Sequence, residues 1–269
     1  MAIRFDHKPG LVVYITAGDP SLAATREIVL AAIDAGADVI ELGVPFSDPL
    51  ADGPIIQRAS ERALAHGTSL KDVLALAREI RAERSAAGLV IFSYLNPILR
   101  YGLGKFADDA AAAGVDGVLA TDMIVEEAAE YLAEMNRAGL APVFLAAPTS
   151  PDERLKAIAT HSKGFVYAIS RTGITGKQQS LTADARELVN RIRRWTGPAG
   201  EGLPVAVGFG ISNADHVAQV AEFADAAVVG SAIVELIERT TSEHGPEAAA
   251  GAVARFIKGL RLPATALAR

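Results

Sequence analysis

The chain has 269 residues, half of them hydrophobic, so it is long enough to bury a large core in one or two domains. Its net charge is −6, with acidic and basic residues mixed along the sequence, which argues against nucleic-acid or membrane-surface binding. The absence of cysteine excludes disulfides and thiolate sites, and the five histidines are scattered without metal-binding spacing, so we expect no metal. The apolar runs are too short to span a bilayer and MAIRFDHKPG lacks a signal-peptide core, which together predict a cytoplasmic protein.

Short runs rich in valine, isoleucine and leucine alternate with amphipathic, alanine-rich segments of helix length. Runs that are apolar on both faces are typical of parallel strands covered on both sides. The predicted strands are LVVYIT (11–16), DVIEL (38–42), LVIFSY (89–94), DGVLAT (116–121), APVFLA (141–146), GFVYAIS (164–170), PVAVG (204–208) and DAAVVG (225–230). The predicted helices include 21–36, 69–88 and 181–195, with 54–66 and 246–260 as extra helices, and Gly36, Gly114 and Gly139 as helix-ending positions.

Eight strands alternating with helices predict a single (β/α)8 TIM barrel with extra helices, occupying residues 1–269 as one domain. The alternative is a doubly wound open sheet. Its usual G-x-G-x-x-G motif is missing, because the first strand leads into ITAGDPS.

Barrel active sites form at the C-terminal ends of the strands. The residues expected at that face are Thr16, Glu41, Tyr94, Asn96, Asp122, Tyr167, Gly208, Phe209 and Gly230. Glu41 ends the second strand, and Asp52 lies in the loop that follows it, which is rich in glycine and proline. Burial would raise the pKa of the first carboxyl while a wetter partner stays ionised, so the two could divide acid and base work. The alternative is a charged strand end followed by a solvated turn.

Two further segments suggest ligand binding. GFG (208–210) follows the seventh strand, and Gly230-Ser231 opens a helix after the eighth, which is the common phosphate-binding corner of barrels. The loop SRTGITGKQQS (170–180) follows the sixth strand and is either a lid over substrate or a surface insertion. Gly176 of this loop could add an N–H group to the phosphate corner.

Taken together, these motifs resemble the alpha subunit of tryptophan synthase. The resemblance covers about residues 11 to 260, and its most specific part is LGVPFSDPLADGPIIQ (42–57) directly after Glu41. The other matching motifs occur in the expected order: TAGDP (16–20), SYLNPILRYG (93–102), SRTGITG (170–176), GFGIS (208–212) and GSAIV (230–234).

The resemblance implies a lyase that cleaves indole-3-glycerol phosphate to indole and glyceraldehyde 3-phosphate by a retro-aldol reaction, without metal or cofactor. Glu41 would protonate the indole ring carbon and then remove the hydroxyl proton, while Asp52 would accept the indole N–H and Thr175 would orient Asp52. The apolar slot for the indole would be lined by Tyr14, Tyr94, Leu119, Tyr167 and Phe209. The phosphate would lie on N–H groups of Gly176, Gly210, Gly230 and Ser231.

The resemblance also implies a partner, the pyridoxal-phosphate-dependent beta subunit, in an alpha2beta2 tetramer. It would dock near Asp48, Asn96 and Lys105, and the pyridoxal phosphate would belong to the partner. Two departures stand out. The helix that usually precedes the first strand is missing from MAIRFDHKPG, and Met123-Ile124 follow Asp122 where the family commonly has an apolar residue and then proline.

Three alternatives remain open at this point. Another phosphate-binding barrel, such as an aminosugar isomerase, also uses paired acids, although these normally come from opposite sides of the ring. A stand-alone indole-releasing lyase would need no partner. A non-enzymatic barrel could bind a sugar phosphate or serve as a regulatory partner.

Overall fold

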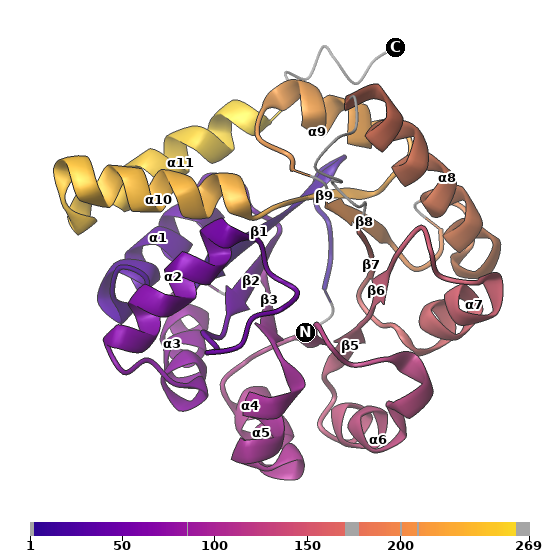
Figure 1. Cartoon of the computed structure of the whole chain (residues 1–269), viewed down its shortest axis with the longest axis horizontal. Helices are drawn as coiled ribbons and strands as arrows, with labels where there is room; N and C mark the ends of the chain where they lie inside the picture. Colours follow the sequence, from indigo (N-terminus) through magenta and orange to yellow (C-terminus); the bar gives the residue numbers. More distant parts are fainter. Residues whose placement is uncertain (1–2, 85, 170–177, 200, 209, 262–269) are drawn as a thin grey trace.

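The computed structural model describes residues 3–84, 86–169, 178–199, 201–208 and 210–261. Parallel strands form a central ring, and helices pack around its outside (Figure 1). The strands are β1 (Gly10–Thr16), β2 (Val39–Gly43), β3 (Gly88–Ser93), β4 (Gly117–Ala120), β5 (Ala141–Val143), β6 (Leu145–Ala146), β7 (Val166–Ile169), β8 (Val205–Gly208) and β9 (Ala226–Val229). The chain is therefore a (β/α)8 barrel, as predicted.

The ring closes through one interrupted strand. β5 pairs with β4 and β6 pairs with β7, and only Phe144 separates β5 from β6. The carbonyl of Phe144 also accepts a hydrogen bond of 3.1 Å from the N–H of Tyr167. The predicted strand 141–146 thus supplies both segments, and its two halves hydrogen-bond to different neighbours.

The helices follow the predicted pattern, with boundaries shifted by a few residues. They are α1 (Leu22–Asp34), α2 (Pro54–Ala65), α3 (Leu70–Glu83), α4 (Leu95–Tyr101), α5 (Leu103–Ala112), α6 (Ala129–Arg137), α7 (Asp152–His161), α8 (Gln178–Thr196), α9 (Ala214–Ala221), α10 (Ser231–His244) and α11 (Ala249–Leu260). The predicted extra helices are α2 and α11, the latter preceded by a short 3-10 turn, and a third extra helix, α4, which was not predicted, lies between β3 and α5. Gly36, Gly114 and Gly139 have φ of 107°, 78° and 74°, which confirms the left-handed helix ends. Among the described helices, none has the length and apolar character needed to cross a membrane.

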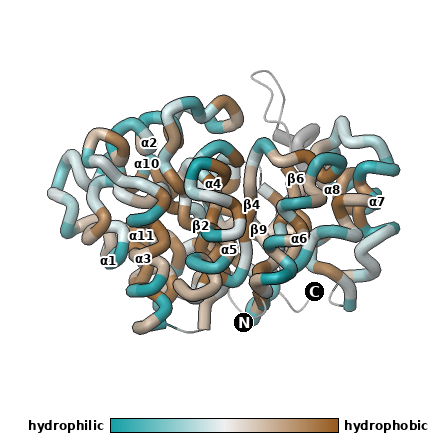
Figure 2. The backbone as a smooth tube through the Cα atoms, turned by 90° about the horizontal axis from the view of Figure 1, so that it is seen from below, coloured by the Kyte–Doolittle hydropathy of each residue, from teal (hydrophilic) through white to brown (hydrophobic). Residues whose placement is uncertain are grey.

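The hydrophobic residues lie mainly between the strands and the helices, while the outer helix faces are more hydrophilic (Figure 2). A second apolar cluster fills the inside of the ring; it includes Val12, Val39, Val90, Leu119, Phe165 and Val228. The barrel interior is therefore packed with side chains, which leaves the C-terminal face as the place for a binding site.

The N-terminal segment closes the opposite end of the barrel. No helix precedes β1 in residues 3–9, in agreement with the sequence. Instead, Ile3 and Phe5 insert into the inner apolar cluster, and the described chain begins near the centre of the ring (Figure 1). A Cβ atom on Gly10 would lie 2.2 Å from Phe5, and one on Gly164 would lie 2.7 Å from Ile3. Glycine at these two positions makes room for the two side chains.

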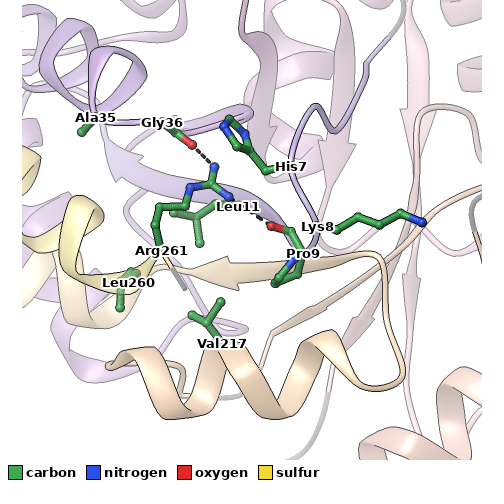
Figure 3. Close-up of a pocket in the computed structure, with 9 residues that line it drawn as sticks. All are labelled: His7, Lys8, Pro9, Leu11, Ala35, Gly36, Val217, Leu260 and Arg261. Carbon is green, nitrogen blue, oxygen red and sulfur yellow. Dashed lines mark hydrogen bonds between the residues drawn. The ribbon is translucent and has the colours of Figure 1, made fainter. Parts of the chain in front are cut away.

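A buried carboxylate at the bottom of the barrel binds both the segment before β1 and the residue that follows α11. Asp38 accepts hydrogen bonds from the N–H of Leu11 and from Arg261, at 2.7 and 2.8 Å, and lies 2.7 Å from Nδ1 of His7. Arg261 also donates to the carbonyls of Gly36 and Pro9 (Figure 3). The cavity of about 300 Å3 beside these residues is thus bordered by groups that already bind one another.

Candidate active site

The strands direct alternate side chains into the barrel. In β1, Val12 lies in the inner apolar cluster and Tyr14 one layer nearer the C-terminal face. Val39 and Glu41 follow the same alternation in β2, and Glu41 is the register partner of Tyr14. The strand pairing therefore places a carboxyl group on the apolar layer, facing inward.

A cavity of about 560 Å3 opens above this layer. Its apolar part includes Tyr14, Ile55, Phe92, Tyr167, Ile169 and Val228. Its polar end includes Gly210, Ser212, Gly230 and Ser231. Glu41 also contributes to its wall. The size suits a small organic molecule, with an apolar region at one end and backbone donors at the other.

Glu41 is the most perturbed carboxyl group of this cavity. Its side chain has no exposed surface, and among the described residues neither carboxylate oxygen has a hydrogen-bond partner. Burial raises the pKa of Glu41 to about 8, because a charge without partners is unfavourable in a desolvated site. At neutral pH this group is mostly protonated and can donate a proton.

Asp52 lies in the turn before α2. Burial raises its pKa to about 6, and a hydrogen bond from the hydroxyl of Tyr94 opposes that rise. Asp52 is only half-buried, whereas Glu41 is fully buried. As predicted, the more solvent-exposed carboxyl group has the lower pKa of the two. Its own atoms do not border the cavity, but those of Ala51 and Ile55 on either side do.

The charges of both carboxyl groups raise the pKa of the same two tyrosines, Tyr14 and Tyr167. The pKa of Tyr14 is raised by its burial and further by the charges of Asp52 and Glu41. The pKa of Tyr167 is raised well above its usual value by burial, then by Glu41 and Asp52. The structure thus brings both carboxyl groups into the electrostatic surroundings of one apolar pocket.

The opposite end of the cavity is formed by the start of α10. Gly230 is the N-cap residue, and Ser231 begins the 14-residue helix. First-turn N–H groups lack intrahelical acceptors, and the helix dipole favours an anion beside them. Gly210, with φ of 55°, lies on the same wall. This corner can therefore accept a phosphate group.

Comparisons with known proteins agree with this geometry. A model of the family described as tryptophan synthase alpha chain matches residues 2–259. The tryptophan synthase alpha chain of Solibacter usitatus is 51% identical over 245 residues, which is 91% of this chain and 90% of that protein.

The chain belongs to the tryptophan synthase alpha chain family.

The solved structures agree with the sequence relatives. The alpha subunit of tryptophan synthase from Legionella pneumophila superposes with a TM-score of 0.82 at 36% identity, covering 94% of this chain and 92% of that one. The tryptophan synthase complex from Pyrococcus furiosus has a chain that superposes with a TM-score of 0.82 at 38% identity, covering 94% of this chain and 98% of that one.

Membership fixes the reaction. The chain is a carbon–carbon lyase of tryptophan biosynthesis that cleaves indole-3-glycerol phosphate to indole and glyceraldehyde 3-phosphate. The isomerase and the non-enzymatic barrel considered above are thereby set aside.

Several residues that the alpha-chain resemblance assigns to the substrate site lie elsewhere or outside the described residues. Leu119 is buried in the inner apolar cluster and does not border the cavity. Tyr94 contacts Asp52 instead of lining the cavity wall. Thr175, Gly176 and Phe209 lie outside the described residues, as does most of the loop 170–180.

The residues expected to contact the beta subunit are all exposed at the C-terminal face. Asp48 lies in the loop after β2, and Asn96 lies in the first turn of α4. Lys105 lies on α5, where it pairs with Asp109 at 2.5 Å. The contact with a beta subunit remains a prediction.

Several residues of this alpha chain site were not predicted from the sequence, among them Ile55, Phe92 and Glu235, and neither was the close approach of two glycines to tyrosine rings. Glu235, one turn after Ser231, borders the cavity and places a carboxylate near the phosphate corner. A Cβ on Gly43 would lie 2.3 Å from the hydroxyl of Tyr14, and one on Gly208 would lie 2.6 Å from that of Tyr167. The signal for the glycines was available, since each ends a strand next to one that carries an inward tyrosine.

Proposed function

We propose that Glu41 and Asp52 divide the acid–base work of indole-3-glycerol phosphate cleavage. Glu41, protonated at neutral pH, donates its proton to the indole ring carbon that bears the side chain. Asp52, mostly ionised at that pH, accepts the indole N–H and so stabilises the tautomer whose C–C bond breaks. The Glu41 carboxylate then takes the proton of the adjacent hydroxyl as that bond breaks, and Asp52 returns its proton to the indole nitrogen, so both carboxyl groups regain their starting forms.

The main support for this division of work is the position of Glu41. It is buried on the wall of a cavity whose other end is the start of α10. The raised pKa of about 8 suits both steps, because a group of this pKa is protonated before the reaction and, after donating, is a stronger base than an ordinary carboxylate. Asp52, with a pKa of about 6, suits an acceptor that must be ionised first.

The remaining roles follow from the shape of the cavity. The flat indole lies against Tyr14, Phe92 and Tyr167, and the phosphate lies against backbone N–H groups of Gly230 and Ser231. Anchoring at both ends holds the scissile bond beside Glu41. Thr175, Gly176 and Phe209 retain their expected roles in orienting Asp52, binding phosphate and lining the slot.

The partner is a beta subunit, in an alpha2beta2 tetramer, and the cell compartment is the cytoplasm. Exposed Leu50, Leu99 and Ile124 lie on the loops and helices that follow β2, β3 and β4, near Asp48 and Asn96. An apolar group of this kind with polar neighbours supports a docking face there. The proposed steps use side chains and backbone of this chain alone, and pyridoxal phosphate belongs to the partner.

Turnover of indole-3-glycerol phosphate to free indole tests these roles. Glu41→Gln and Asp52→Asn should each lower turnover by roughly 10²- to 10⁴-fold, the usual contribution of a positioned acid or base. Glu61→Gln, an exposed carboxyl on α2, is the matched control and should keep normal turnover. Near-normal turnover in both site variants would overturn the assignment.

The same assay distinguishes a subunit from a stand-alone lyase. Turnover is measured with and without added beta subunit. Strong activation supports the alpha2beta2 partnership, and full activity without any response to the beta subunit argues for an enzyme that works alone.

A further inference from the structure

Tyr94 connects the end of β3 to the loop that carries Asp52. It is the N-cap residue of α4, is 5% exposed, and packs its ring against Phe46 with centroids 5.1 Å apart. Its hydroxyl donates a hydrogen bond of 3.1 Å to Oδ2 of Asp52. The same hydroxyl oxygen accepts a hydrogen bond of 2.9 Å from the N–H of Ala51.

These two contacts fix the direction of the hydroxyl proton. A tyrosine hydroxyl has one proton to donate, and here the N–H of Ala51 already occupies an acceptor position on the oxygen. The proton therefore points to the carboxylate of Asp52. The buried ring cannot swing away without leaving Phe46.

We propose that Tyr94 is a positioning residue for Asp52: its hydrogen bond holds one carboxylate oxygen and leaves the other for the indole N–H. This inference rests on the role of Asp52 under the proposed function. It differs from the expectation that Tyr94 lines the indole slot, because Tyr94 acts through Asp52 and does not border the cavity.

The electrostatics agree with this role. Burial raises the pKa of Asp52, and the hydrogen bond from Tyr94 lowers it by stabilising the ionised form. Removal of the hydroxyl leaves the burial in place and takes away the opposing contribution. Asp52 then becomes harder to ionise, and less of the enzyme carries a ready proton acceptor at a given pH.

The test is Tyr94→Phe, which keeps the ring and removes only the hydroxyl. The acid limb of the kcat/KM profile for indole release should move upward by about one pH unit, the scale of one hydrogen bond to a charged group. Tyr101→Phe is the matched control, since the Tyr101 hydroxyl also contacts a carboxylate, Asp109, at 2.6 Å but outside the cavity. Its acid limb should stay in place.

A ¹³C-carboxyl NMR titration of Asp52 gives a readout that does not depend on activity. The Asp52 resonance, assigned with Asp52→Asn, should titrate at higher pH in Tyr94→Phe than in the unmodified chain. An unmoved resonance and an unmoved acid limb would overturn the positioning role while Asp52→Asn still shows that Asp52 matters. Normal turnover in Asp52→Asn would instead defeat the proposed function itself.

Discussion

Glu41 should make the folded chain less stable as the pH rises. Burial raises its pKa to about 8 in the folded state, against an ordinary value of 4.5 that applies when the chain is unfolded. The folded state therefore keeps a proton that the unfolded state releases between these values. Its contribution to stability is fully present below pH 4.5 and is lost as the pH rises to 8.

The size of this effect follows from the two pKa values. Each pKa unit corresponds to about 1.4 kcal/mol, so the loss between pH 5 and pH 8 is roughly 3–4 kcal/mol. That is a large share of the ~5–15 kcal/mol by which domains are stable. In Glu41→Gln the side chain is neutral at every pH, so this loss disappears while the contributions of the other groups remain.

The assay is urea unfolding followed by circular dichroism at pH 5 and pH 8. The unfolding free energy of Glu41→Gln, minus that of the unmodified chain, should increase by roughly 3–4 kcal/mol between the two conditions. Glu61→Gln serves as the control, because its carboxyl is exposed and its difference should stay near zero. Equal pH dependence in all three proteins would refute the burial of an unpaired Glu41.

Three further substitutions test other parts of the molecule. Asp38→Asn leaves Arg261 without its buried partner and should cost about 3–5 kcal/mol of unfolding free energy, measured by urea titration, with little change in KM. Unchanged stability would contradict a stabilising contact between Asp38 and Arg261. Gly43→Ala should raise KM for indole-3-glycerol phosphate, because its Cβ would lie 2.3 Å from the hydroxyl of Tyr14 and displace the ring; an unchanged KM would count against this ring as part of the indole site. Glu235→Gln removes a negative charge near the phosphate corner and should lower KM by about two- to threefold at low salt, less at high salt. If KM of Glu235→Gln equals that of the unmodified chain at every ionic strength, the phosphate does not bind near Glu235.

The strands of the barrel could be predicted because their signal is local. Runs such as LVVYIT are apolar on both faces, and the structure places a buried strand there. The break at Phe144 was not visible, because the residues on both sides are equally apolar and only the pairing with different neighbours divides them. The start of α8 was not visible for a different reason: the helix begins at Gln178, in a polar stretch before the amphipathic pattern starts.

The site could be predicted only where chain order determines position. Glu41 lies near the C-terminal end of β2 and Gly230-Ser231 open a helix, so the barrel rule alone brings them to one face. The contact between Tyr94 and Asp52 depends on how one loop folds over the end of the next strand, which no local pattern records. The packing of Ile3 at the bottom of the barrel is equally non-local, because Ile3 fills space left by Gly117 and Gly164, far along the chain.

The pH dependence of kcat/KM for indole release tests the division of work between the two carboxyl groups most directly. Asp52 must be ionised and Glu41 protonated in the free enzyme, so the profile should be bell-shaped, with an acid limb near pH 6 and an alkaline limb near pH 8. A rate that stays constant from pH 5 to pH 9, or that keeps rising above pH 8, would contradict it.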